Sequence, residues 1–266
     1  MPRRARSWAI RLAAVLLCAA AGLALRTALS GGGERAVRGA ALPVEPVATT
    51  TGFSTGAAQS HRLPPHTTLI ATARSAAVRV HRRPRGGKRG SRVLHRRTIG
   101  GRAVPLTFLV VRRRPGWVRV ALPTRPNGAE GWLRRRAVRL TTTRLSLVVD
   151  RRAHRLVLRD GRRQVLHATI GVGRAVSPTP RGRYFVTDVI RTDDPAGFFG
   201  PYALGLSAHS QVYTSFDGGD GQVGIHGTNR PDLLGHDVSH GCIRVRNAVI
   251  RRLAHRLPLG TPVVIR

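Results

Sequence analysis

The sequence is short of cysteine, lysine and acidic residues. Its 266 residues include two cysteines, Cys18 and Cys242, 12 Asp and Glu residues, and a single lysine, Lys88. Two cysteines are too few for a disulfide-stapled scaffold or a cysteine-rich zinc module. Hydrophobic residues still make up 41% of the chain. That fraction allows a packed core and argues against global disorder.

The scarcity of acid leaves a formal charge of +34, carried almost entirely by arginine. The arginines are spread over the whole length and do not form one basic helix or tail. This distribution, with abundant Ala and Gly, favours a bias of base composition over dedicated nucleic-acid recognition. A chain this cationic still binds polyanions or an anionic surface, and more weakly as salt rises.

The N-terminus has the pattern of an export signal. Residues 2–6 (PRRAR) are positively charged, and residues 12–25 (LAAVLLCAAAGLAL) form an uncharged apolar run. Ala28-Leu29-Ser30 then offers a small-x-small cleavage site. We expect residues 1–30 to be a signal peptide; an uncleaved anchor starting at Trp8 is the alternative. Either way, the body of the protein is predicted at the cell wall or the outer face of the cytoplasmic membrane, with only this segment touching the membrane.

The predicted export bears on the role of Cys242, the cysteine outside the predicted signal peptide. If residues 1–30 are cleaved, Cys242 is the one cysteine left. A lone thiol in an exported protein has no partner for a disulfide. Cys242 is therefore either buried and inert or a reactive thiol.

The first half of the mature chain is predicted to be a linker and a small β domain. Residues 31–65 are rich in Gly, Ala, Thr, Ser and Pro and predict a flexible linker. Residues 66–141 contain short β-type runs separated by turns. Between these runs, we expect the Arg/Gly-rich insert 82–102 to be an exposed loop.

Residues 115–140 (PGWVRVALPTRPNGAEGWLRRRAVRL) resemble the end of a bacterial SH3-like barrel. The resemblance predicts a small SH3-like β-barrel for residues 66–141, with Trp117 and Trp132 as core or groove aromatics. Such a module would position the protein or touch the cell wall.

A second domain is predicted from residue 142 to 266. Alternating apolar and polar side chains predict an antiparallel meander, followed by further strands and one helix. The expected strands cover residues 144–150, 154–161, 164–173, 182–190 and 261–266. The helix covers residues 245–257, with Val245, Val249, Leu253 and Leu257 as its apolar face.

The residues with chemical potential lie close together near the C-terminus. Residues 225–247 contain His226, His236, His240 and Cys242. A thiol becomes a nucleophile when a base, usually His, takes its proton, and the attacked carbonyl then needs oxyanion donors. Gly241 before the cysteine permits unusual backbone angles. The backbone N–H groups of Gly241 and Cys242 are natural oxyanion donors.

This pattern resembles the L,D-transpeptidase catalytic (YkuD) domain. The matching residues are His226-Gly227-Thr228, then Ser239-His240-Gly241-Cys242-Ile243-Arg244, then Asn247. Residues 177–182 (SPTPRG) and 223–225 (VGI) support the match, which covers residues 143–266. The resemblance implies a mainly β, β-sandwich-like catalytic domain.

The resemblance also implies a role for each matching residue. Cys242 would be the acyl-accepting nucleophile and His226 its base, with the carbonyl of Gly227 orienting the imidazole. His240 and Gly241 would shape the oxyanion pocket.

Three further residues are predicted at the substrate side of the site. Arg244 would hold a carboxylate or structure the loop after the nucleophile. Ser239 is expected beside the substrate, and Asn247 would bind substrate or brace the following helix. Residues 191–221 have the look of a Gly-rich flap, in which Phe198, Phe199 and Tyr202 contact either the substrate or the loop itself.

The implied reaction is acyl transfer on the stem peptides of peptidoglycan. Cys242 would form a thioester with a tetrapeptide stem, and an amine of a second stem would resolve it into a 3→3 cross-link. Water as the acceptor would make the protein an L,D-carboxypeptidase instead. We expect no cofactor and no metal.

Other hypotheses stay open. His226, His236, His240 and Cys242 are all competent zinc ligands, although their spacing is not a familiar zinc arrangement. No third triad carboxylate can be assigned, and Asp232 and Asp237 are expected to be solvated loop residues. Cys242 could also be an inert buried thiol. A non-catalytic protein that binds anionic cell-wall polymers is the remaining alternative.

Overall fold

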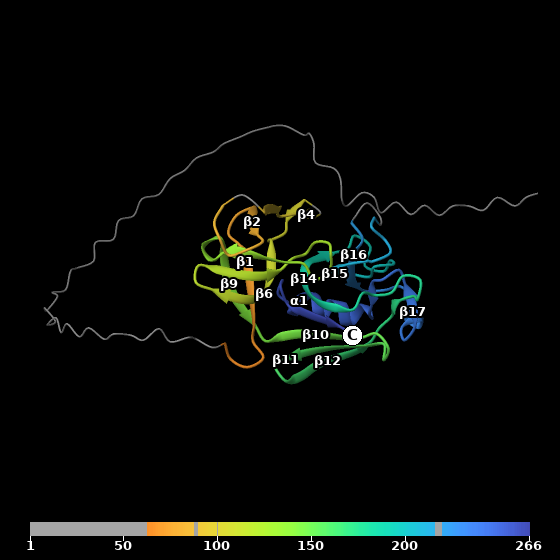
Figure 1. Cartoon of the computed structure of the whole chain (residues 1–266). Coiled ribbons are helices and arrows are strands. Elements are labelled where there is room, and N and C mark those ends of the chain that lie inside the picture. The colour runs from red at the N-terminus through yellow and green to blue at the C-terminus, as the bar shows by residue number, and fades with distance from the viewer. Residues whose placement is uncertain (1–62, 88–89, 100, 216–219) are drawn as a thin grey trace, which may run out of the picture. The chain divides into compact units, whose positions relative to one another are not determined.

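The computed structural model describes residues 63–87, 90–99, 101–215 and 220–266 (Figure 1). The predicted export segment 1–30, and the predicted linker up to residue 62, lie outside the described residues. Within the described ranges, no helix is both long and apolar enough to cross a membrane. The predictions about export and anchoring therefore stay predictions.

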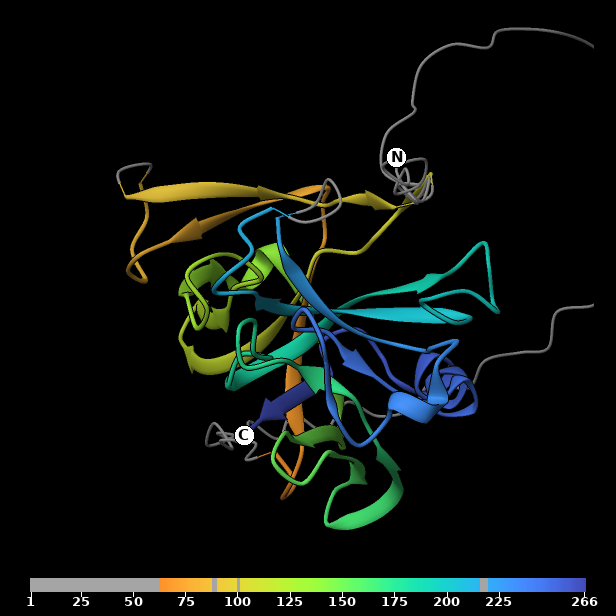
Figure 2. The same cartoon turned by 90° about the vertical axis from the view of Figure 1, so that its right-hand side faces the viewer.

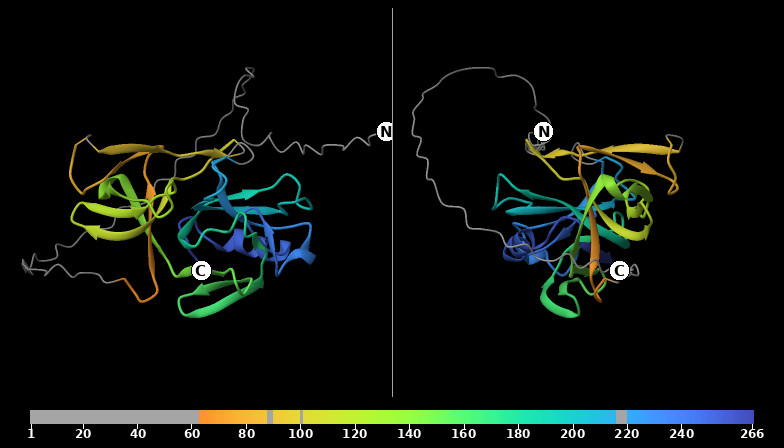
Figure 3. Two further views of the ribbon diagram at one scale, coloured as in Figure 1. Left: turned by 45° about the vertical axis from the view of Figure 1, so that its right-hand side comes forward. Right: turned by 90° about the vertical axis from the view of Figure 1, so that its left-hand side faces the viewer.

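The described chain is mainly β, as predicted, and its strands form two large sheets (Figure 3). We call the first one the N-terminal sheet; its strand order is β3-β2-β8-β7-β6-β1-β9. Its strands are β1 (Thr68–Ala73), β2 (Ala77–His81), β3 (Ser91–His95), β6 (Thr107–Arg114), β7 (Trp117–Ala121), β8 (Glu130–Arg134) and β9 (Val138–Thr143). A short 3-10 turn, η1 (Arg135–Ala137), precedes β9.

The Arg/Gly-rich insert 82–102 is not a simple loop. It contains β3, which pairs with β2, and the short strand β4 (Thr98–Ile99), which pairs with β5 (Arg102–Ala103). The prediction of a loop failed because the sequence of β3 (SRVLH) shows no alternation of apolar and polar side chains. One of its two apolar residues, Val93, is even 39% exposed. The ladder to β2 holds this strand, and of its apolar side chains only Leu94 packs, partly buried, against the core.

The two predicted barrel tryptophans lie on the outer face of the N-terminal sheet. Val118, Val120 and Leu133 point into the core from β7 and β8, and the residues between them face the other way. Trp117 and Trp132 are only 7% and 6% exposed, since arginine side chains cover them. The guanidinium carbon of Arg134 lies 4.3 Å from the ring centroid of Trp117, and that of Arg114 lies 5.6 Å from Trp132.

The second sheet, here called the C-terminal sheet, has the strand order β12-β11-β10-β19-β14-β15-β16-β18. Its strands are β10 (Leu145–Asp150), β11 (Arg155–Asp160), β12 (Arg163–Thr169), β14 (Gly182–Arg191), β15 (Tyr202–His209), β16 (Gln222–His226), β18 (Ile243–Arg244) and β19 (Pro262–Ile265). The antiparallel meander β10–β11–β12 is confirmed. A separate pair joins β13 (Val172–Gly173) to β17 (Asp237–Ser239), and η2 (Pro231–Leu233) is a 3-10 turn.

One α-helix, α1 (Asn247–Arg256), covers β15 and β16 (Figure 2). Val245, Leu253 and Leu257 are buried as predicted. Val249 is only partly buried, and the adjacent Ile250 is fully buried in its place. The apolar face of the helix is thus one residue wider than the strict four-residue spacing indicated.

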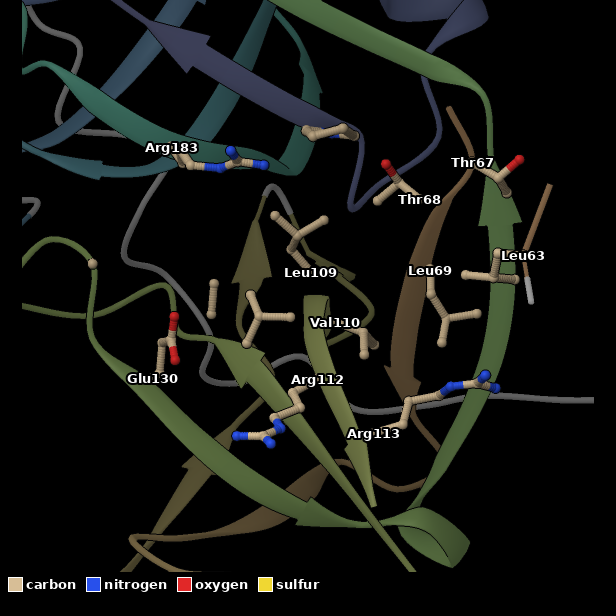
Figure 4. Close-up of a pocket in the computed structure, with 14 residues that line it drawn as sticks. Leu63, Thr67, Thr68, Leu69, Leu109, Val110, Arg112, Arg113, Glu130 and Arg183 are labelled. Atoms are coloured by element: carbon tan, nitrogen blue, oxygen red, sulfur yellow. The ribbon is translucent and has the colours of Figure 1, made fainter. Parts of the chain in front are cut away.

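Each sheet has its own cluster of buried hydrophobic side chains. Residues of both sheets also line a cleft of about 770 Å³ (Figure 4). Leu69 and Leu109 form part of its apolar wall, and Arg112, Arg113 and Arg183 supply charge. The lining contains neither cysteine nor histidine, so the size of a cleft does not locate the chemistry in this molecule.

Candidate active site

Strand pairing puts the predicted nucleophile and base on one face of the C-terminal sheet. Strand β16 ends at His226 and runs parallel to β18, with His226 opposite Arg244. Cys242 precedes Arg244 by two residues, and side chains two apart in a strand share a face. Cys242, His226 and Arg244 accordingly line one narrow cleft of about 50 Å³.

The turn that carries the thiol, residues 239–244 (the Cys242 turn), is held by its own side chains. The hydroxyl of Ser239 donates to the carbonyl oxygen of Cys242 at 2.6 Å and accepts from the N–H of Gly241 at 3.0 Å. Gly241 has φ +121°, a conformation that residues with a Cβ rarely adopt. A second hydroxyl, that of Ser177, donates to the carbonyl of His240 at 2.8 Å.

These bonds bear on the predicted oxyanion pocket. The N–H of Gly241 already donates to Ser239, so it is not available to an oxyanion in this arrangement. The expectation that Gly241 supplies such a donor therefore does not fit the structure. The glycine instead permits the sharp turn before Cys242, which leaves the Cys242 N–H as the remaining donor of the predicted pair.

His226 is a buried, neutral imidazole held in one orientation. Its Nδ1 lies 2.7 Å from the carbonyl oxygen of Gly227, the orienting contact that the resemblance implies. A carbonyl only accepts, so the proton sits on Nδ1 and Nε2 keeps its lone pair. Burial lowers the pKa of His226 to about 4, and the charge of Arg244 acts in the same direction. At neutral pH, His226 is thus able to accept a proton.

The Cys242 thiol is neutral in the resting site. Burial raises the pKa of Cys242, against the opposing effects of a hydrogen bond from the Gly224 backbone N–H and the charge of Arg244. With the base neutral and the thiol protonated, the pair is not a preformed thiolate–imidazolium. The proton must instead move to His226 as the sulfur attacks.

Arg244 brings a buried positive charge to the cleft. It is 7% exposed, and burial lowers its pKa. Its guanidinium carbon lies 4.5 Å from the ring centroid of Phe198. In the part of the chain that the structure describes, its Nε is buried without a hydrogen-bond partner. A buried donor without a partner is rare in a folded protein, so this nitrogen is an unsatisfied group next to the cleft lining.

Aromatic side chains from two loops enclose the imidazoles. Phe198 and Phe199, in the turn between β14 and β15, have ring centroids 5.8 and 4.9 Å from that of His226. On the other side, the ring of Tyr213 lies 5.7 Å from that of His240. The remaining lining residues are Ser210, Gly221, Gln222, Val223 and Ser239.

The predicted flap 191–221 is two loops separated by a strand. Its middle part is β15, a central strand of the sheet, in which Leu204 and Leu206 are fully buried. The small residues of this segment let strands pack closely and do not make it a loop. Tyr202 is the first residue of β15, at the opposite end of the strand from the 210–221 segment. Its ring centroid lies 5.4 Å from that of His255, and Tyr202 is not among the residues that line the cleft.

Comparison with known proteins agrees with this geometry. The model of the L,D-transpeptidase catalytic domain family (YkuD) matches residues 144–265. YqjB of Bacillus subtilis, which is named for this activity, is 32% identical over 126 residues, which is 45% of this chain and 69% of that protein. The chain belongs to the L,D-transpeptidase catalytic domain family.

Other relatives differ from the chain in extent. YkuD of Bacillus licheniformis, also named for this activity, is 39% identical over 122 residues, which is 46% of this chain and 64% of that protein. The match therefore spans less than two thirds of the length of that relative. The solved structure of Bd1075 from Bdellovibrio bacteriovorus is 25% identical and covers 47% of this chain and 48% of its own, with a TM-score of 0.36. The family as a whole acts on peptidoglycan stem peptides.

Two of the predicted substrate-side residues of this L,D-transpeptidase domain have their polar atoms engaged within the protein. Asn247 is the first residue of α1, and its Oδ1 accepts from the N–H of Thr228 at 2.8 Å. It thereby braces the loop after His226. Ser239 is 2% exposed, and its hydroxyl holds the Cys242 turn. Of the three predicted substrate-side residues, Arg244 is the one that lines the cleft and has a buried donor without a partner.

The other titratable residues of this region stay apart from the thiol. Asp232 pairs with Arg230 at 2.7 Å, and Asp237 with His154 at 2.8 Å. His236 is exposed. No three His, Cys, Asp or Glu side chains come close enough to hold a metal ion anywhere in the described ranges. His226, His240 and Cys242 line one cleft, but they do not form a group that could hold a metal ion, and His236 is not among the lining residues.

The predicted flap 191–221 includes the loop that bears Ser210, Tyr213 and Gly221, but sequence reasoning did not single out these three residues. An isolated tyrosine in a stretch of small polar residues matches no motif. The one signal was the run of glycines near residue 221, which marks close approach of backbone segments. The side chain that holds this loop, Arg125, lies 85 residues before Ser210 in the sequence.

Proposed function

We propose that this chain is a peptidoglycan L,D-transpeptidase that uses Cys242 as its nucleophile and forms 3→3 cross-links. The observation that carries the proposal is the shared cleft of Cys242 and His226, in which the imidazole keeps its lone pair on Nε2. The family to which the chain belongs supports the same substrate class, the stem peptides of peptidoglycan.

The first half-reaction acylates the enzyme. The sulfur of Cys242 attacks the carbonyl carbon of the third residue of a tetrapeptide stem, while Nε2 of His226 takes the thiol proton. The C–N bond to the terminal D-Ala breaks, and the proton passes from His226 to the leaving amine. The product is a thioester between Cys242 and the tripeptide stem. The thioester retains the energy of the broken amide, so no nucleotide is consumed.

The second half-reaction releases the acyl group. An amine from a second stem attacks the thioester carbonyl, His226 takes its proton, and the C–S bond breaks as the thiol is reprotonated. The new amide is a 3→3 cross-link. If water attacks in place of the amine, the product is a free tripeptide and the enzyme acts as an L,D-carboxypeptidase.

Two groups are proposed to handle charge during these steps. The backbone N–H of Cys242 would donate to the oxyanion, because the N–H of Gly241 is already engaged. Arg244, with its unpaired buried Nε, would bind a carboxylate or carbonyl oxygen of the stem peptide. His240, exposed at the rim with Tyr213 beside it, would line the substrate path.

We further propose the arrangement around the catalytic domain. Residues 1–30 would direct or anchor the protein outside the cytoplasm, 31–65 would be a linker, and 66–141 would be an SH3-like barrel ahead of the domain 142–266. The supporting observations are the separate buried clusters of the two sheets. The charge of +34 supports attraction to anionic cell-wall polymers.

The deciding experiment incubates the purified protein with disaccharide-tetrapeptide and follows the products by mass spectrometry. Cys242→Ala, checked for folding by circular dichroism, is the control. Cross-linked dimers that are absent with the variant support the transpeptidase. Tripeptide alone identifies the carboxypeptidase. Absence of any Cys242-dependent product from the folded protein would contradict catalysis and favour a wall-binding protein, whose polymer binding weakens with salt.

A further inference from the structure

The loop between β15 and β16 forms one wall of the candidate active site. In this 210–221 loop, described except for residues 216–219, Ser210, Tyr213 and Gly221 line the cleft beside Cys242. The neck of the loop is closed by a hydrogen bond from the N–H of Ser210 to the carbonyl of Gly221, at 2.8 Å. The ring of Tyr213 packs edge-on against His240.

A single arginine of the N-terminal sheet holds both sides of this loop. Arg125 lies in the turn between β7 and β8, 85 residues before Ser210 in the chain. One terminal nitrogen of its guanidinium donates to the carbonyl of Ser210 at 2.7 Å. The other donates to the carbonyls of Tyr213 at 2.9 Å and Asp220 at 3.0 Å. One side chain thus bridges three backbone groups from the two arms of the loop.

Asn127, in the same turn, holds the residue just before the loop. Its amide nitrogen donates to the carbonyl of His209 at 2.8 Å, and its Oδ1 accepts from the N–H of His209 at 2.9 Å. These two bonds copy the pairing of a neighbouring β-strand. The end of β15 is thereby fixed relative to the turn that carries Arg125.

The packing at the neck of the loop leaves no room for a side chain at Gly221. Gly221 has φ +73°, and a Cβ built there would lie 2.0 Å from the carbonyl oxygen of Tyr213 and 2.9 Å from a terminal nitrogen of Arg125. The two arms of the loop and the guanidinium therefore meet at van der Waals distance around this glycine.

The strand that follows the loop is held in a similar way by Arg97, which lies in the connection between β3 and β4. Arg97 donates to Oε1 of Gln222 at 2.9 Å and pairs with the buried carboxylate of Asp188 at 2.7 Å. Gln222 itself lines the cleft. Both ends of the 210–221 loop are thus fixed by side chains from outside the catalytic family match, which begins at residue 144.

We propose that Arg125, assisted by Asn127, is a positioning residue of the active site, which sets the 210–221 loop and Tyr213 over the cleft. The role follows from guanidinium geometry: a planar fork of donors reaches three carbonyls, and an ammonium group does not have this geometry. The catalytic consequence rests on the proposed function, whereas the effect on the loop does not. The N-terminal sheet, on this account, is part of what shapes the substrate site.

The test compares Arg125→Gln, Arg125→Lys and the control Arg119→Gln in the full chain. Arg119 lies on β7 in the same sheet and pairs with Glu130 at 2.6 Å, so its replacement removes the same charge at another place. Hydrogen exchange of the backbone amides of residues 210–213 and 220–222 is followed by mass spectrometry. We expect these amides to exchange at least about 10-fold faster in Arg125→Gln, and at the wild-type rate in Arg119→Gln. Unchanged exchange in Arg125→Gln would overturn the proposal.

Kinetics on disaccharide-tetrapeptide then separate positioning from simple stability. The loop carries no reacting atom, so we expect Arg125→Gln to raise KM on the order of 10-fold with kcat changed less than about threefold. Arg125→Lys should recover only part of this loss. A general loss of folded protein would instead lower the apparent kcat at constant KM, and this result for Arg125→Gln would contradict a positioning role.

A double-mutant cycle identifies the path of the effect. In a Tyr213→Ala background, Arg125→Gln should change KM by less than about twofold, because its effect acts through the loop that bears Tyr213. Fully additive effects would overturn the proposal. If the wild-type protein makes no Cys242-dependent product, the proposed function fails, while the exchange data still decide whether Arg125 sets the loop.

Discussion

The Cys242 turn and the 210–221 loop both line the candidate cleft, but their hydrogen bonds come from different parts of the chain. Ser239 holds the Cys242 turn from within, through bonds to Gly241 and Cys242 two and three residues away. Arg125 holds the 210–221 loop from 85 or more residues away. One wall of the site is locally encoded, and the other depends on the folding of a second sheet.

This difference explains what could be predicted from the sequence. The Cys242 turn has a local motif, so its residues could be singled out from the sequence and from the resemblance that the motif carries. The short strands beside it, β16, β17 and β18, were not predicted. The bonds of Arg125 join residues with no common motif, and nothing in a run of arginines distinguishes this one. Likewise β15 was mistaken for part of a flap, because burial between neighbouring strands is a tertiary fact that its small residues do not reveal.

The largest expected effect comes from the thiol. Cys242→Ser should lower kcat/KM by at least about 10³-fold, because a neutral imidazole with a depressed pKa activates a hydroxyl far less than a thiol. Steady-state kinetics and intact mass spectrometry of the acyl-enzyme measure this. The exchange pattern of the 210–221 loop should stay that of the wild type. A variant with near-normal activity would refute a nucleophilic Cys242.

The next effect distinguishes strain in the Cys242 turn from strain elsewhere. Gly241→Ala places a Cβ at φ +121°, with a cost of about 1–3 kcal/mol in stability and a displaced thiol. Gly116→Ala, at φ +71° in a hairpin of the N-terminal sheet with open space around it, is the matched control. Both should lower the melting temperature, but only Gly241→Ala should lower kcat/KM. Equal activity losses would show that the turn has no special geometric role.

The stability of the folded protein should depend on pH through His226. Its folded pKa of about 4 lies below the ordinary value of 6.5, so the unfolded chain binds more protons between these values. His226 therefore destabilises the folded state as pH falls from about 6.5 to 4, by about 3 kcal/mol in full. Denaturant unfolding at a series of pH values measures the slope. His226→Gln should flatten it, and an unchanged slope would assign the effect to other groups.

The smallest effects compare the two anchors directly. Ser239→Ala and Asn127→Ala each remove two hydrogen bonds, with an expected cost of about 1–3 kcal/mol each. Ser239→Ala should mainly lower kcat, since it loosens the nucleophile. Asn127→Ala should mainly raise KM, since it loosens the wall. Kinetics of both variants on one substrate check this, and the same pattern from both would remove the distinction between the two walls.

The buried carboxylate of Asp188 affects how the protein unfolds. It is 2% exposed, it lies in β14 of the C-terminal sheet, and its ionic partner Arg97 lies in the connection between β3 and β4. Moving the β3–β4 connection away while Asp188 stays buried would leave a negative charge without its counter-ion, which is costly in a protein interior. The two sheets are thus thermodynamically coupled, and heating should melt them in one cooperative transition instead of two.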